Sequence, residues 1–158
     1  MKEQKTNVMR LLEQKKVSYT PHEYPHGDDA VDGVSVAKLC GQEPGQVFKT
    51  LVARGASKAI YVFDVPVTGE LDLKKAAKAA GEKSIAMIHV SEINALTGYV
   101  RGGCSPVGMK KFFTTVIDES AKKYERIYFS GGRIGLQVET TLAELEKVIK
   151  FSLADISC

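Results

Sequence analysis

Long apolar runs are absent from this sequence of 158 residues. No stretch approaches the roughly 20 residues that a helix needs to cross a bilayer, so we expect no membrane association. Residues 1–10 are polar and charged and lack the apolar stretch of a signal peptide, which favours a cytoplasmic protein. The three cysteines, Cys40, Cys104 and Cys158, have no CxxC spacing and leave an odd thiol. We therefore expect reduced cysteines rather than a disulfide framework.

A strong charge of either sign is absent too. Lys and Arg number 22 against 19 Asp and Glu, and a net charge of +3 does not by itself indicate nucleic-acid binding. The sequence has no Walker A loop and no glycine fingerprint after a strand, so we expect no nucleotide cofactor. It also has no repeat, linker or low-complexity tract. Its length and its 44% hydrophobic content fit one domain over residues 1–158.

Helical and strand patterns alternate irregularly along the chain. Five helices are predicted, each after a residue that can cap it: Thr6, Ser35, Asp72, Ser91 and Thr141. Seven strands are predicted, at 17–24, 47–53, 59–65, 85–88, 114–117, 126–130 and 136–139. Several of the links between strands have hairpin length, so the sheet must be at least partly antiparallel. The pattern predicts an α+β domain.

Lys49 is the most informative residue of the predicted strand 47–53. Successive side chains of a strand point to opposite faces, so Lys49 shares a face with Val47 and Leu51, while Thr50 lies on the other. Neither face of this strand has the polar side chains expected of a solvent-exposed face. Two readings remain open: an edge lysine whose aliphatic stem reaches water, or a lysine in a cleft that requires an anionic partner.

A second segment, residues 102–106, reads Gly-Gly-Cys-Ser-Pro. Glycines let a ligand approach the main chain, and consecutive N–H groups can surround an anion or a developing oxyanion. A tight connection without a ligand is the alternative. Cys104 could be a nucleophile, but no His lies near it in the sequence to activate it. The glycine-rich segment 130–135 is, by itself, a hairpin turn.

Two weaker clusters carry other chemistry. A metal site could be built from a polar segment that lacks helical periodicity: His22, Glu23, His26, Asp28 and Asp29. It falls short of the ligand set of a zinc site, so we expect no metal. The lysines of a predicted helix form a solvated face or, alternatively, contact an RNA backbone: Lys74, Lys75 and Lys78.

Taken in order, several tracts resemble the YbaK/EbsC family over almost the whole chain. They are residues 47–51, 69–75, 97–99, 102–106, 117–118, 127–132 and 135–136. Each tract is weak alone, and the signal comes from their number, order and spacing. The resemblance implies a mixed, largely antiparallel β-barrel, closed or nearly closed, flanked by helices. It also implies a relation to the editing domain of bacterial prolyl-tRNA synthetases.

The resemblance, to a family of Cys-tRNA(Pro)/Cys-tRNA(Cys) deacylases, implies hydrolysis of mischarged aminoacyl-tRNA, with Cys-tRNA(Pro) as the expected substrate. The implied partners are the 3′ end of an aminoacylated tRNA and prolyl-tRNA synthetase, and a monomer and a homodimer both remain open. We expect the substrate's own thiol to attack the carbonyl and release a thiolactone. Three alternatives remain: an Ala-tRNA(Pro) deacylase that uses water, a non-catalytic module that binds tRNA or a synthetase, and a hydrolase that uses Cys104.

The family's site residues map onto this chain one by one. Lys49 matches its functional lysine, and Thr50 is the neighbour of that lysine. The loop is matched by Gly102, Gly103, Cys104, Ser105 and Pro106. The pocket is matched by Tyr24, Ser130 and Gly131. The chain departs from the family at Gln137, where an Asp is common, and around Val31 or Asp32, where an aromatic residue is replaced. These departures bear on the choice of amino acid more than on the reaction.

Overall fold

Two β-sheets form the centre of the computed structural model, which describes residues 5–25, 32–100 and 103–158. The larger sheet has the strand order β4 (Ile85–Met87), β2 (Phe48–Gly55), β3 (Ile60–Pro66), β5 (Thr114–Asp118) and β8 (Ser152–Ala154). The smaller sheet has the order β1 (Thr20–Glu23), β7 (Leu136–Thr140) and β6 (Ile127–Ser130). The predicted α+β class is confirmed.

Four of the six strand pairings are antiparallel, and β5 lies parallel to both β3 and β8. Each sheet ends in two edge strands, and the two sheets are linked by an isolated bridge between Val47 and Tyr128. In the described part of the chain the sheets are open, so the predicted closed barrel is not confirmed.

The helices are α1 (Asn7–Gln14), α2 (Gly33–Leu39), α3 (Leu73–Ala80), α4 (Val90–Thr97) and α5 (Leu142–Leu145), with the 3₁₀ turns η1 (Pro44–Gln46) and η2 (Glu119–Lys123). The predicted caps Thr6, Asp72 and Thr141 are confirmed, since each side chain accepts a hydrogen bond from the first turn. None of the described helices has the length and apolarity to span a membrane.

Two predicted caps are wrong because the helices begin earlier. The carboxylate of Asp32 accepts the N–H of Ser35, so Asp32 caps α2 and Ser35 lies inside it. Likewise, α4 starts after His89 rather than after Ser91. The seven predicted strands are present, whereas β8 was missed. The last helix, α5, ends at Leu145, although the Ile149 N–H still donates to the Leu145 carbonyl (3.1 Å).

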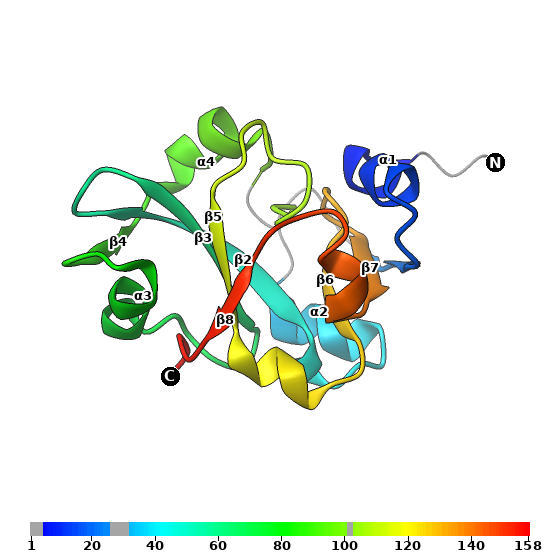
Figure 1. The fold of residues 1–158 in the computed structure, drawn as a ribbon. Coiled ribbons are helices and arrows are strands. Elements are labelled where there is room, and N and C mark those ends of the chain that lie inside the picture. Colours follow the sequence, from blue (N-terminus) through cyan, green and yellow to red (C-terminus); the bar gives the residue numbers. More distant parts are fainter. Residues whose placement is uncertain (1–4, 26–31, 101–102) are drawn as a thin grey trace.

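The core divides into two clusters on either side of the larger sheet. One joins α1, the smaller sheet and α5, and it contains Leu12, Phe48 and Phe129. The other joins the opposite face to α3, and it contains Phe63 and Ala76. Figure 1 shows α1 and the smaller sheet at one end of the molecule, with α3 and the β2–β3 turn toward the other. The N-terminal half of β2 lies between these two parts.

Candidate functional site

A cleft of about 1180 Å³ opens between the N-terminal half of β2 and the smaller sheet. It exists because β4 pairs only with the last residues of β2, from Ala53 to Gly55. The bridge from Val47 to Tyr128 brings β6 to the other end of the same edge. Between these two contacts, the edge of β2 lines the cleft. Six of the predicted site residues line it: Tyr24, Lys49, Thr50, Cys104, Ser130 and Gln137.

Lys49 lies at the cleft with its side chain 30% exposed. Its Nζ lies 3.4 Å from Oε2 of Glu70, whose own side chain is 80% exposed and which also lines the cleft. Lys49 is paired across the sheet with Val65, on the face that packs toward α3. An ion pair with so exposed a partner contributes little to stability. The ammonium can therefore exchange the Glu70 carboxylate for an anionic ligand at small cost.

Thr50 points to the opposite face of β2, where it meets a buried acid. Its Oγ1 donates to Oδ1 of Asp64 (2.5 Å), the residue opposite it on β3. Asp64 is 2% exposed, and burial raises the pKa of its carboxyl to about 7, against the lowering effect of the Thr50 hydrogen bond. Asp64 was not among the site residues predicted from the sequence. The available signal was an acid inside the apolar strand 59–65.

In the described part of the glycine loop, Cys104 is the residue that lines the cleft. Burial raises the pKa of its thiol to about 12, and the nearby Asp64 adds to the rise while a hydrogen bond with Thr97 opposes it. The thiol is therefore neutral at pH 7 and a poor nucleophile. Gly102, which was predicted to contribute to this loop, lies outside the described residues.

The other loop residues are engaged within the fold. The Gly103 N–H donates to the Val100 carbonyl (3.0 Å), and a Cβ on Gly103 would lie 3.0 Å from the Cα of Arg133. Ser105 is fully buried, and its Oγ accepts the Val107 N–H. Pro106 lines a separate hollow of about 200 Å³. Gly103, Ser105 and Pro106 are thus not among the residues that line the main cleft.

The smaller sheet supplies the opposite wall. Gln137 is 3% exposed, and its Oε1 accepts a hydrogen bond from Nε2 of Gln42 (2.7 Å). Ser130 lies opposite Gln137 on the neighbouring strand β6. Burial raises the pKa of the Tyr24 phenol. Gly131 does not line the cleft: its N–H donates to the Leu136 carbonyl, as the predicted hairpin turn requires. The polar groups of this wall stand among apolar side chains such as Phe129 and Leu136, and its lining residues carry no charge at neutral pH.

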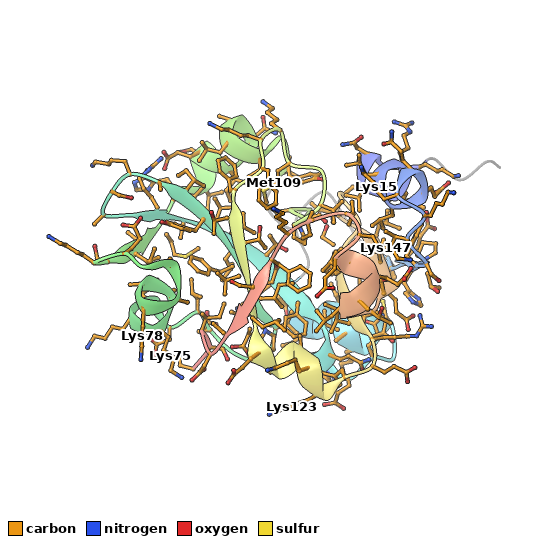
Figure 2. All side chains as sticks on the ribbon, in the orientation of Figure 1. Lys15, Lys75, Lys78, Met109, Lys123 and Lys147 are labelled. Carbon is orange, nitrogen blue, oxygen red and sulfur yellow. The ribbon has the colours of Figure 1, made fainter. Side chains whose placement is uncertain are left out.

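The described members of the two weaker clusters, His22, Glu23 and the three lysines of α3, are not among the residues that line the cleft. Nε2 of His22 lies 2.7 Å from Oε1 of Glu139. Across residues 5–25, 32–100 and 103–158, no three His, Cys, Asp or Glu side chains gather as a metal site would require. Three members of the candidate metal cluster lie outside the described residues: His26, Asp28 and Asp29. Figure 2 shows Lys75 and Lys78 at the outer surface near α3.

Comparison with known proteins gives one family. The model of the family described as "Aminoacyl-tRNA editing domain" matches residues 28–148. A protein of Enterococcus faecalis (strain ATCC 700802 / V583), named "Putative Cys-tRNA(Pro)/Cys-tRNA(Cys) deacylase EbsC", is 43% identical over 155 residues, which is 98% of this chain and 94% of that protein.

Solved structures agree with the sequence relatives. The crystal structure of "a putative trans-editing enzyme for prolyl tRNA synthetase" is 26% identical, with a TM-score of 0.82 over 98% of this chain and 99% of its own. The structure of "hypothetical protein APE2540" has a TM-score of 0.86 at 22% identity, over 97% of this chain and 100% of its own, and it shows a shared fold.

These relations agree with the geometry of the cleft. The family model covers more than half of the chain, and the Enterococcus relative aligns along nearly all of it. Five of the seven tracts that carried the resemblance contribute residues to one cleft: 47–51, 69–75, 102–106, 127–132 and 135–136. The chain therefore belongs to the aminoacyl-tRNA editing domain family, as its resemblance to the YbaK/EbsC family predicted.

Proposed function

We propose that this protein deacylates mischarged aminoacyl-tRNA, with Cys-tRNA(Pro) as its substrate, and so edits in trans during translation. The family supports an aminoacyl ester as the substrate class, and the Enterococcus relative is named for Cys-tRNA(Pro) and Cys-tRNA(Cys). Such editing is needed because a pocket for one small side chain rejects another by only about 1–3 kcal/mol.

The observation that carries the proposal is the position of Lys49. Its ammonium lines a cleft of about 1180 Å³, and the carboxylate that it meets there belongs to the exposed Glu70. The 3′ end of tRNA presents phosphates and a polarised ester carbonyl, and either can replace that carboxylate. Lys49 would thus bind the terminal nucleotide and orient the ester.

The nucleophile in this mechanism is the thiol of the substrate's own cysteine. Its sulfur attacks the ester carbonyl, the bond from the carbonyl carbon to the ribose oxygen breaks, and the thiol proton ends on that oxygen. A thiolactone leaves, and water opens it later. Cys104 is the protein's own thiol at the cleft, and it is neutral at pH 7 and therefore a poor nucleophile. This supports the substrate's thiol as the nucleophile.

The developing oxyanion needs donors aimed at it. We assign this role to main-chain amides of the loop around Cys104. The Gly103 N–H is not one of them, because it already donates to the Val100 carbonyl. The polar wall at Ser130 and Gln137 would then face the amino acid, where Gln137 replaces the acid common in the family.

We also propose a cellular setting for the reaction. Residues 1–158 would form one editing domain that acts in the cytoplasm, as a monomer or a homodimer, on the 3′ end of aminoacylated tRNA. Prolyl-tRNA synthetase would supply the specificity for the tRNA body. A structural neighbour whose name links it to that synthetase supports this partner.

A deacylation panel of Cys-, Ala-, Ser- and Pro-tRNA(Pro) tests the function. We expect the Cys ester to be cleaved fastest by the wild type. Lys49→Ala should lower kcat/KM by roughly 10- to 150-fold, which corresponds to the ~1.5–3 kcal/mol of a hydrogen bond to a charged group. Its thermal stability should barely change, because the pair with Glu70 is exposed.

Lys123→Ala is the matched control. It removes the same charge from an exposed position on η2 that does not line the cleft, shown at the lower edge of Figure 2. Equal activity of Lys49→Ala and Lys123→Ala would refute the role of Lys49. Equal rates on the Ser and Cys esters would exclude the substrate thiol as nucleophile. Faster loss of the Ala ester would favour the water mechanism.

A further inference from the structure

Asp64 is a buried acid that the proposed reaction has not used. It is 2% exposed, and within the described part of the chain its Oδ2 makes no hydrogen bond. A buried polar atom without a partner costs free energy, so an acid in this state needs an explanation beyond packing.

Asp118, the other buried aspartate of the described chain, shows what a structural acid looks like here. Its two oxygens accept three main-chain N–H groups, from Ser120, Ile156 and Ser157. Those bonds outweigh the effect of burial and lower the pKa of Asp118, whereas burial raises that of Asp64. Among the described residues, Asp64 has one hydrogen-bond donor, the Thr50 hydroxyl, and Thr50 lines the cleft.

The hydroxyl of Thr50 is polarised by this contact. A hydroxyl has one hydrogen and two lone pairs, and when Asp64 is ionised the hydrogen of Thr50 is given to its carboxylate. Only acceptor capacity then remains for a ligand in the cleft. The charge of Asp64 helps to raise the pKa of the nearby Cys104 thiol, which is neutral at pH 7 and therefore brings no charge to the acid. Lys49 points to the opposite face of β2 and does not compensate the acid.

We propose that Asp64 is a positioning residue that holds the Thr50 hydroxyl as a hydrogen-bond acceptor for the α-ammonium of the aminoacyl ester. A cationic donor fits both features. It supplies a hydrogen to the free lone pair of the Thr50 hydroxyl, and it supplies the positive charge that would balance the buried Asp64 carboxylate. The site thereby selects aminoacyl groups with a free amine over N-acylated ones. This inference rests on the proposed function for the identity of the ligand.

Binding of two stable probes tests the inference without turnover. The probes are 3′-cysteinylamino-3′-deoxyadenosine, in which an amide replaces the ester, and its N-acetyl derivative, which has no ammonium. Calorimetry on the wild-type protein should show about tenfold or greater preference for the free amine. Asp64→Asn keeps the shape of the side chain and should reduce the preference to within about twofold.

Thr50 provides the second pair of variants. Thr50→Val should lose the preference, and Thr50→Ser, which keeps the hydroxyl, should restore it. The ratio between the probes is the decisive readout, because a merely structural defect would weaken both probes alike. If Asp64→Asn does not fold, the Thr50 pair decides alone.

Failure of the inference differs from failure of the function. If the wild type cleaves Cys-tRNA(Pro) but binds both probes equally, or if Asp64→Asn keeps the preference, the role of Asp64 is overturned while the function stands. If the wild type prefers the free amine through Asp64 but cleaves no ester, the inference stands as a binding site and the deacylase function falls.

Discussion

Replacing Asp118 by Asn tests how the fold supports the partner of Lys49. Asp118 ends β5, and its Oδ1 accepts the N–H groups of Ile156 (3.0 Å) and Ser157 (3.2 Å). This anchors the segment that follows β8. Ser157 bridges Leu71 and the Cys158 N–H donates to the Glu70 carbonyl, so the anchored segment holds the residue whose carboxylate meets Lys49.

The magnitude follows from three hydrogen bonds. A bond to a charged acceptor contributes about 1.5–3 kcal/mol and a neutral one about 0.5–1.5 kcal/mol. Asp118→Asn weakens the hydrogen bonds from the Ile156 and Ser157 N–H groups. It also replaces Oδ2, which accepts the Ser120 N–H, by an NH2 group, so that two donors face each other. We expect a loss of about 2–5 kcal/mol in the free energy of unfolding at pH 7.

The pH dependence has a defined sign. Burial would raise the pKa of Asp118, but the hydrogen bonds with Ser120, Ile156 and Ser157 outweigh it and hold the pKa below its ordinary value. An acid whose pKa is lowered by folding stabilises the fold above its unfolded pKa, about 3.9, and loses that contribution as pH falls through the folded pKa. The difference between wild type and Asp118→Asn should therefore be full at pH 7 and shrink below about pH 4.

Urea unfolding followed by circular dichroism at several pH values measures this difference. Asp155→Asn is the matched control, since it makes the same chemical change at a side chain that is 57% exposed and pairs with Lys75. The Asp155→Asn control should unfold at the same urea concentration as the wild type. A loss below about 0.5 kcal/mol in Asp118→Asn at pH 7, or a difference independent of pH, would refute the reasoning.

Two further variants separate roles at the cleft. Cys104→Ala should retain Cys-tRNA(Pro) deacylation within about fivefold, because the thiol is neutral at pH 7 and does not act as nucleophile; loss of all activity in a single-turnover assay would contradict this. Glu70→Gln should lower the KM for aminoacyl-tRNA with little change in thermal stability, because it removes the exposed carboxylate that competes for Lys49. A raised KM would instead show that Glu70 helps to bind the substrate.

Local signals determined how far the sequence could predict the fold. Asp72 was placed correctly at the start of α3, because a cap depends on its nearest neighbours. Ser35 was not the cap of α2, because Asp32 offers the same chemistry three residues earlier. The three residues of β8 form a strand because they pair in parallel with β5, which is distant in the sequence. A segment of three residues is too short for its own pattern to predict that pairing.

The candidate site shows the same division. Lys49 and Thr50 were predicted from the strand and from the resemblance, and both line the cleft. Asp64 was missed, because the pattern of its strand indicates burial and not which hydroxyl lies opposite. That neighbour is set by the register of β2 against β3, in which Thr50 faces Asp64. A register follows from a turn and from long-range pairing, and not from the composition of one strand.

Adjacent residues of a strand ordinarily serve opposite faces, so Lys49 and Thr50 would not be expected to reach one ligand. They do so here because β4 joins β2 only from Ala53 onward, while β6 meets it at Val47. The edge between these contacts is lined by both side chains, the ammonium from one face and the hydroxyl from the other. A ligand that enters at this edge can contact a cation and an acceptor held by a buried acid. Residues on both sides of one sheet thus contribute to a single site because β4 is short.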